Sequence, residues 1–275
     1  PSESDAAVCA DFARGKTFDC IVALGGGSSM DTAKAANFLL TNGGRMRDYH
    51  GYGKATQPML PLIAIPTTAG TGSECQSAAL IADEATHQKM ACLDSKAAAK
   101  IALLDPELTV SLPPRVTAVT GVDAIAHALE TAVTTKRNAL ALMFSHEAFK
   151  RLVVALPQVM ANPQDLEARG QMLLGASFAG TAIEHSMLGA AHSCANPLTA
   201  HYGLTHGVAV GVLLPHVVRF NADAVGYLYG DLVHDVGLLN GTGNAAAEVM
   251  ARYLASLLRA AGLPSRLADC GVSRS

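Results

Sequence analysis

The chain has no tryptophan, and aromatic residues make up only 5% of its 275 residues. Its hydrophobic core must therefore be built mainly from Ala, Val, Leu and Ile, within a sequence that is 50% hydrophobic. Runs of basic residues are also missing: 20 Lys and Arg stand against 23 Asp and Glu, for a net charge of −3. This balance argues against a nucleic-acid partner and against binding to an anionic membrane.

The six cysteines form no Cys-x-x-Cys pair and no compact disulfide framework. Three of them, Cys20, Cys75 and Cys92, lie in or beside apolar, strand-like runs, which predicts reduced, buried thiols. No signal peptide or membrane span is visible. The longest apolar run, VAVGVLLPHVV at 208–218, is too short to span a bilayer and contains a proline and a histidine. We therefore expect a cytoplasmic protein with no membrane partner.

The N-terminal part alternates between strand-like and helix-like segments. FDCIVALGG (18–26) is an apolar run that predicts a buried parallel strand, and SMDTAKAANFLL (29–40) has a helical composition. PLIAIP (61–66), KMACLD (89–94) and KIALLD (100–105) are predicted to be further strands. Alternation of this kind favours a parallel α/β sheet.

Two local features complete this part of the prediction. The glycine-rich stretch 42–54 is expected to be a loop. Ser28, followed three residues later by Asp31, predicts a capping box at the start of the helix.

The pattern changes near SLPPR (111–115), beyond which strand signals are few. We therefore predict two domains, an α/β domain at 1–112 and a helical domain at 113–275. The expected helices of the second domain are 115–133, 138–155, 164–183, 187–202, 205–221 and 243–261.

A glycine turn joins the first predicted strand to its helix. Gly25, Gly26 and Gly27 let the backbone approach a phosphate closely, and the helix N-terminus offers free N–H groups. Met30 occupies the third glycine position of the dinucleotide-binding fingerprint, and the Gly-Lys-Ser/Thr of a P-loop is missing. A plain strand-to-helix turn explains the glycines equally well.

A second turn strengthens the nucleotide interpretation. Thr67, Thr68, Thr71 and Ser73 follow the strand at 61–66, where the carboxyl ends of parallel strands bind ligands. Two such turns could clasp one pyrophosphate. Lys89 could add a positive charge near a ribose or phosphate, although a lone lysine at a strand end is as often simply solvated.

Four separated residues in the helical part could hold a divalent metal. Asp123 and His127 lie four residues apart in GVDAIAHALE and would share one helix face, while His192 and His206 lie in a second apolar, helix-rich region. One carboxylate and three neutral imidazoles would leave a divalent ion one net positive charge, enough to polarise a carbonyl or alkoxide oxygen. Each residue alone is weak evidence, and the other histidines, His87 among them, are assigned no role.

These blocks resemble the iron-containing (group III) alcohol dehydrogenase family, related in fold to glycerol dehydrogenase and dehydroquinate synthase. The resemblance rests on GGGSSMDTAK, IPTTAGTGSE, DPELTVSLPP, TGVDAIAHALE and AAHSCANPLTAHYGLTHGVAVGVLLPHVVRFN, in this order along most of the chain. It implies an α/β dinucleotide-binding domain with a parallel sheet followed by an all-α domain, in a dehydroquinate synthase-like architecture. The metal and the substrate would lie in the cleft between the two.

The resemblance also implies roles for individual residues. It assigns metal ligation to Asp123, His127, His192 and His206, with Fe(II) favoured over Zn(II). It assigns the cofactor, NAD or NADP, to Gly26, Gly27, Ser28, Thr67, Thr68, Thr71 and Lys89. The implied activity interconverts a small primary or secondary alcohol and its aldehyde or ketone.

The sequence departs from the family pattern in two ways. Many members carry a second histidine four residues after the third ligand, where this chain has Asn196, which can donate a hydrogen bond but cannot shuttle a proton. The family also begins with a βαβ unit before the glycine-turn strand and continues beyond the end seen here. We therefore expect an internal fragment, with the segment that chooses NAD over NADP lying outside it.

Two other functions stay open at this point. A dehydroquinate synthase-type lyase would use the same cofactor and metal, but its substrate phosphate needs a basic cluster, and Lys136-Arg137 is the only adjacent basic pair in 115–150. A non-catalytic module that binds nucleotide or metal is the other alternative. A homodimer could form, but no feature of the sequence decides it.

Overall fold

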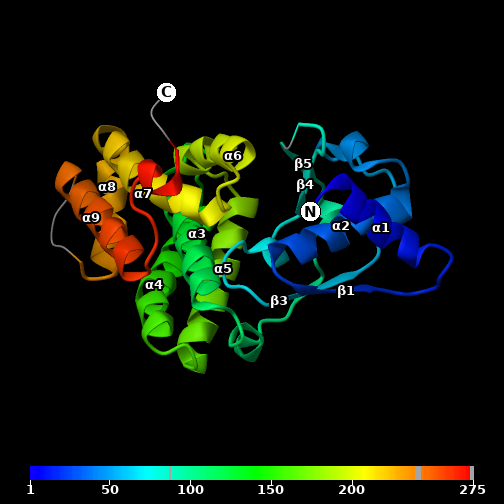
Figure 1. Cartoon of the computed structure of the whole chain (residues 1–275), viewed down its shortest axis with the longest axis horizontal. Helices are drawn as coiled ribbons and strands as arrows, with labels where there is room; N and C mark the ends of the chain where they lie inside the picture. Colours follow the sequence, from blue (N-terminus) through cyan, green and yellow to red (C-terminus); the bar gives the residue numbers. More distant parts are fainter. Residues whose placement is uncertain (87, 239–242, 273–275) are drawn as a thin grey trace.

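The computed structural model describes residues 1–86, 88–238 and 243–272. His87, to which the sequence assigned no role, lies outside them. The chain forms two lobes: an N-terminal α/β part and a C-terminal bundle of helices (Figure 1). No single helix in the described ranges is long and apolar enough to cross a membrane; the pair 206–220 and 222–235 passes this test together but is bent by 112°.

A three-stranded parallel sheet forms one layer of the α/β part. Its strands are β1 (Ile21–Gly25), β3 (Leu62–Pro66) and β6 (Ile101–Ala102), in the order β1-β3-β6. Gly25 pairs with Pro66, so the glycine turn and the threonine turn leave the sheet at the same edge. The predicted strand at 100–105 is shorter than expected, with only two residues in the ladder.

The prediction of a single parallel sheet misses a second one. Strands β2 (Gly51–Tyr52), β4 (Ala78–Ala82) and β5 (Lys89–Leu93) form a mixed sheet in which β4 and β5 are antiparallel. The predicted strand at 89–94 therefore belongs to this hairpin. The expected loop at 42–54 contains β2 and the 3-10 helix η1 (Met46–Tyr49), because Met46 and Tyr49 pack into the core beneath this sheet.

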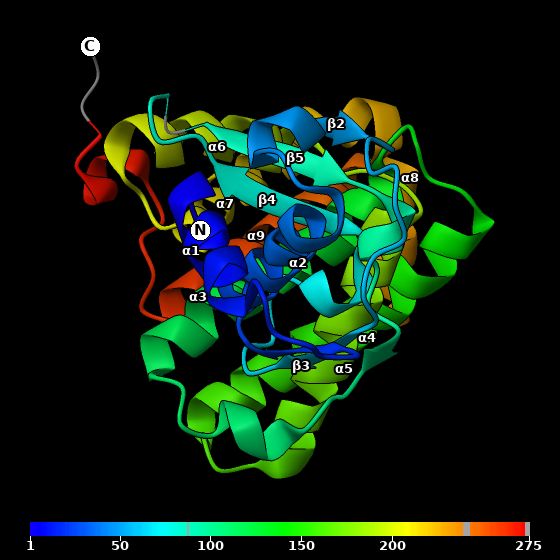
Figure 2. The same cartoon turned by 90° about the vertical axis from the view of Figure 1, so that its right-hand side faces the viewer.

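Helix α2 (Gly27–Asn42) lies between the two sheets and packs against β1 and β4 (Figure 2). Helix α1 (Glu3–Ala13) packs beside it. The prediction that β1 is buried on both faces is wrong. Ala23 packs on Met30 of α2, whereas Val22 and Leu24 point the other way and are 56% and 57% exposed.

Within the described residues, the helical lobe contains the six predicted helices and one more. They are α3 (Pro114–Val133), α4 (Ala139–Ala161), α5 (Leu166–Glu184), α6 (Ala190–Tyr202), α7 (His206–Phe220) and α9 (Asn244–Ala260). The additional helix, α8 (Ala222–Asp235), follows α7 after a sharp bend. The largest hydrophobic core lies here and is rich in Ala, Val and Leu, as the lack of tryptophan requires.

Helix α4 runs six residues past its predicted end, although Pro157 lies inside it, because a distant side chain replaces the lost hydrogen bond. Pro157 has no N–H, so the carbonyl of Val153 loses its helical hydrogen bond. The hydroxyl of Tyr253 on α9 donates to that carbonyl at 2.8 Å. The helix therefore continues to Ala161.

The cysteine prediction is partly wrong. All six thiols are free, but only Cys92 is buried, whereas Cys20 is exposed because it precedes β1 on the surface. Cys75 is partly buried in the 3-10 helix η2 (Ser73–Cys75).

Buried polar groups join α2 to the threonine turn. The ammonium of Lys34 is fully buried and donates to the carbonyl and hydroxyl of Ser73 at 2.6 and 2.9 Å and to the carbonyl of Ala78 at 3.0 Å. The Ser73 hydroxyl donates in turn to Asp31 at 2.8 Å. Burial lowers the pKa of Lys34 and raises the pKa of Asp31, and their opposite charges offset these shifts.

The same turn is fixed to helix α5 of the other lobe. Ser177 donates to Glu74 at 2.5 Å, and Ser77 donates to Glu184 through its amide at 2.9 Å and its hydroxyl at 2.6 Å. The backbones of Gly72 and Gly180 pack directly against each other, so that a side chain on either residue would clash with the other's backbone. These contacts hold the threonine turn against the helical lobe.

Candidate metal centre and cofactor turns

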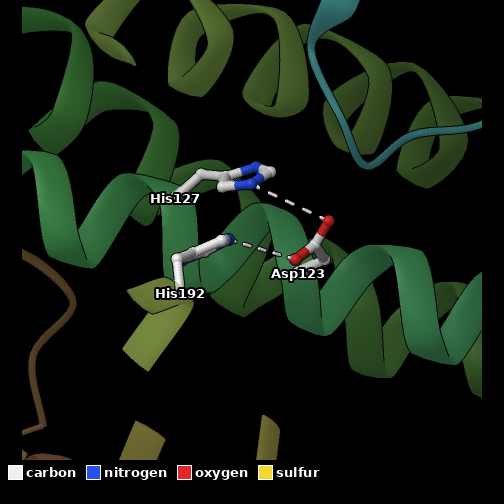
Figure 3. Close-up of side chains that lie close together, drawn as sticks. All are labelled: Asp123, His127 and His192. Carbon is white, nitrogen blue, oxygen red and sulfur yellow. Dashed lines mark ion pairs between the residues drawn. The ribbon is translucent and has the colours of Figure 1, made fainter. Parts of the chain in front are cut away.

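Asp123 and His127 lie one turn apart on α3 and face the start of α6. Both are buried, and the Nε2 atom of His127 lies 3.8 Å from Asp123 Oδ2. Figure 3 shows the rings of His127 and His192 directed towards the Asp123 carboxylate. The ligand atoms of these three residues lie within 4.8 Å of one another.

His192 and His206 complete the cluster from two further helices. His192 lies in the first turn of α6, and His206 is the first residue of α7. Their Nε2 atoms lie 3.4 and 3.9 Å from Asp123 Oδ1. All three histidines thus direct the same ring nitrogen at one carboxylate, and the structure brings together the four residues that the sequence singled out.

The charges in this cluster suit a cation. Burial alone would raise the pKa of Asp123, but His127, His192 and His206 hold it below its usual range. Burial lowers the pKa of His127 and lowers the pKa of His206 to about 4, which leaves both rings neutral and able to act as ligands. Burial also disfavours the charged form of His192, but the carboxylates of Asp123 and Glu130 outweigh it and raise its pKa to about 9. The ring of His192 therefore carries a second proton on Nε2, the nitrogen that faces Asp123, and a bound metal ion would displace this proton.

Unpaired polar atoms show that a divalent cation fits these residues. Among the described residues, Asp123 Oδ1 and His192 Nε2 are buried without a hydrogen-bond partner. Separations of 3.4–3.9 Å are too long for hydrogen bonds, and buried polar atoms are rarely left unpaired. A cation among them would satisfy the carboxylate and the ring nitrogens together.

Two acceptors outside the cluster orient two of the rings. His127 Nδ1 lies 3.2 Å from the carbonyl of Gly70, in the threonine turn. His192 Nδ1 lies 2.5 Å from Glu130 Oε2. Glu130 is not among the residues singled out from the sequence, although its position three residues after His127 on the same helix is a usable signal.

The two predicted cofactor turns lie against each other. A side chain on Gly26 would meet Thr68 at 3.2 Å, and one on Gly27 would meet Thr71 at 2.6 Å. The predicted Ser28 capping box is wrong: α2 begins after Gly26, which lies in extended backbone, and no side chain caps it. The residue in the N-cap position, Gly26, has no side chain that could accept a hydrogen bond from the first amides of α2. These amides therefore remain free beside the threonine turn.

Lys89 is the first residue of β5. It lines a pocket of about 700 Å³ together with Asn196, Pro197 and His201 of α6. The positive charge of Lys89 also contributes to the lowered pKa of His206. The pocket thus runs between the β4–β5 hairpin and the helix that carries His192.

Comparison with known proteins identifies the family. Residues 1–106 match the model of iron-containing alcohol dehydrogenases, and residues 117–275 match the model of the C-terminal part of that family. The chain belongs to the iron-containing alcohol dehydrogenase family. The predicted resemblance is therefore confirmed, while the exact division at 112/113 stays a prediction.

Individual relatives agree with this family and its fold. The chain is 37% identical to the NAD-dependent methanol dehydrogenase of Bacillus methanolicus, covering 99% of this chain and 72% of the relative. Crystal structures of 1,3-propanediol oxidoreductase (30% identity, TM-score 0.95) and of Bifidobacterium kashiwanohense sulfoacetaldehyde reductase with NAD+ (30%, 0.89) match 99% and 100% of the chain. The chain spans 72% of each. The predicted fold is confirmed, and the family is one of oxidoreductases for alcohols and aldehydes.

Proposed function

We propose that this chain carries the metal centre and part of the cofactor site of an NAD(P)-dependent oxidoreductase that interconverts a small primary or secondary alcohol and its aldehyde or ketone. The observation that carries the proposal is the convergence of three Nε2 atoms on Asp123 at the interface of the two lobes. The names of the relatives support the same class of reaction. No observation favours the lyase or the non-catalytic module.

In this proposal Asp123, His127, His192 and His206 hold a divalent metal, with Fe(II) favoured over Zn(II). When bound, the metal supplies Lewis acidity towards the substrate oxygen and the nicotinamide supplies the hydride acceptor or donor. The four side chains would fix the position of the metal. With three neutral imidazoles and one carboxylate, they would carry a net charge of −1. Asp123, His127 and His192 are buried, which limits the access of water to that side of the site, whereas His206 is partly exposed.

The two turns bind the pyrophosphate of the cofactor. The glycines give its oxygens access to the free amides at the start of α2, and the hydroxyls of the facing turn donate further hydrogen bonds. Lys89, whose positive charge acts on His206, is proposed to contact the part of the cofactor nearest the metal. The proposed contacts are Gly26, Gly27, Ser28, Thr67, Thr68, Thr71 and Lys89.

Asn196 lines the pocket of about 700 Å³ that Lys89 also lines, and its amide cannot transfer a proton. We expect Asn196→His to raise kcat for alcohol oxidation by about tenfold or more, since a positioned proton acceptor contributes roughly 10²-fold or more in favourable geometry. Steady-state rates of NAD+ reduction with a primary alcohol measure this. Asn196→Gln is the control, because it keeps an amide and should not raise kcat. A loss of activity in Asn196→His would show that the amide itself has a specific role.

The proposed function is tested by oxidation of NADH and NADPH with a panel of short aldehydes. The assay is run anaerobically on the metal-free protein, reconstituted separately with Fe(II) and with Zn(II). We expect turnover only after metal is added, and the panel then also gives the preferred metal and cofactor. Metal binding without turnover on any aldehyde or alcohol would contradict the proposal and favour a binding module.

A further inference from the structure

We propose that Glu130 is a positioning residue for the metal centre, which fixes the ring of His192 so that only its Nε2 atom faces the metal. The inference rests on the proposed function in one respect, because His192 must be a ligand for Glu130 to act through it. It concerns a residue to which neither the sequence motifs nor the relatives' names give a role.

Glu130 is buried, and both of its carboxylate oxygens accept hydrogen bonds from the first turn of α6. Oε2 lies 2.5 Å from His192 Nδ1, and Oε1 accepts the amide N–H of Ala191 at 2.6 Å. Helix α6 begins at Ala190, so one side chain of α3 holds both the helix start and the ligand on it. A carboxylate that accepts two such hydrogen bonds allows the ring little freedom to rotate.

This contact decides which nitrogen of His192 is free. Because a carboxylate only accepts, His192 must carry its proton on Nδ1. A metal ion would displace the second proton from Nε2, which lies 3.4 Å from Asp123 Oδ1, so Nε2 is the nitrogen left to act as a ligand. His127 shows the same arrangement with a weaker, neutral acceptor, the carbonyl of Gly70 at 3.2 Å. Nδ1 of His206, by contrast, has no partner among the described residues.

The backbone leaves room for the Glu130 carboxylate. A side chain on Gly189, the residue before α6, would lie 2.9 Å from Oε1 of Glu130 and 3.2 Å from its Cδ. Gly189 has an ordinary extended conformation, with φ −113° and ψ −154°, so its backbone does not require glycine. Space for Glu130 is the reason that the structure gives for a glycine here.

Two substitutions test the role from opposite sides of the contact. Glu130→Gln keeps the shape of the side chain, but its single carbonyl oxygen can accept from either Ala191 or His192 and not from both. Gly189→Ala leaves Glu130 unchanged and displaces its carboxylate. Glu74→Gln is the matched control: Glu74 is equally buried and accepts from Ser177, but it lies on no metal ligand.

The readouts are the affinity for Co(II) and the visible absorption spectrum of the Co(II)-loaded protein. We expect both Glu130→Gln and Gly189→Ala to weaken binding by about 10- to 100-fold and to change the spectrum, because the ligand set loses a fixed imidazole. Glu74→Gln should leave affinity and spectrum unchanged, even if it lowers the free energy of unfolding. A purely structural Glu130 would lower stability without changing the spectrum, which would overturn the proposal.

The tautomer of His192 gives a second test that needs no variant of Glu130. In the Zn(II)-loaded protein with ¹⁵N-labelled histidine, NMR should show the proton of His192 on Nδ1 and none on Nε2. A proton on Nε2 would overturn the proposal.

His192→Ala separates this inference from the proposed function. If His192→Ala loses metal while Glu130→Gln keeps full affinity and the wild-type spectrum, the positioning role fails and the ligand assignment stands. If His192→Ala also keeps its metal, both the ligand assignment and the positioning role fail.

Discussion

Asp123→Asn is expected to release the divalent metal and to lower alcohol oxidation by roughly 10³-fold or more, since the metal supplies several kcal/mol of charge stabilisation to the reacting oxygen. Asp123 is the point on which all three imidazoles converge. It is also the only anionic group among the four proposed ligands. Its replacement by an amide would therefore leave the divalent ion with three neutral rings and no anionic ligand. Metal content after dialysis and kcat with a primary alcohol measure the two effects.

The matched control for this prediction is Asp235→Asn. Asp235 also faces a histidine, with its Oδ2 2.6 Å from His146 Nδ1, but the pair lies on α8 and α4 and contains none of the proposed ligands. This variant should keep its metal and its kcat. Full metal occupancy in Asp123→Asn would show that another set of residues holds the ion.

The second large effect concerns stability at the contact between the lobes. A Cβ atom on Gly180 of α5 would lie 2.3 Å from the carbonyl oxygen of Gly72 and 2.8 Å from its Cα. Both atoms belong to the backbone, so no flexible side chain can move aside. We expect Gly180→Ala to lower the free energy of unfolding by about 3 kcal/mol, in the upper range for overpacked sites. Urea denaturation followed by circular dichroism measures this.

Gly170→Ala on the same helix should have the opposite effect. A side chain there would meet nothing within 4 Å, so the substitution only improves helix propensity, by up to about 1 kcal/mol. Equal effects of the two substitutions would show that the lobes do not pack as closely at Gly72 as the structure has them.

Local patterns predicted much of this fold. The apolar strands that end in glycine or threonine turns gave the parallel sheet, and the helical spacing of Asp123 and His127 correctly placed both on one face of α3. The convergence of His192 and His206 on Asp123 could not follow from spacing, because two further helices bring them there. The motif resemblance supplied that step.

Long-range contacts explain what the sequence could not predict. The end of α4 depends on Tyr253, a hundred residues after the carbonyl of Val153 that it caps. Strand β4 and the mixed sheet depend on pairing with β5 and on packing over α2, which local propensity does not contain. Glu130 and its partner His192 are 62 residues apart, so their contact appears only once α6 is placed.

In the proposed function, one divalent ion binds between α3, α6 and α7, held by Asp123, His127, His192 and His206. Anomalous X-ray diffraction at the iron edge, from crystals grown anaerobically with Fe(II), tests it most directly. We expect a single strong peak roughly 2 Å from a carboxylate oxygen of Asp123 and from the Nε2 atoms of the three histidines. A peak elsewhere in the chain, or one that excludes Asp123, would contradict it.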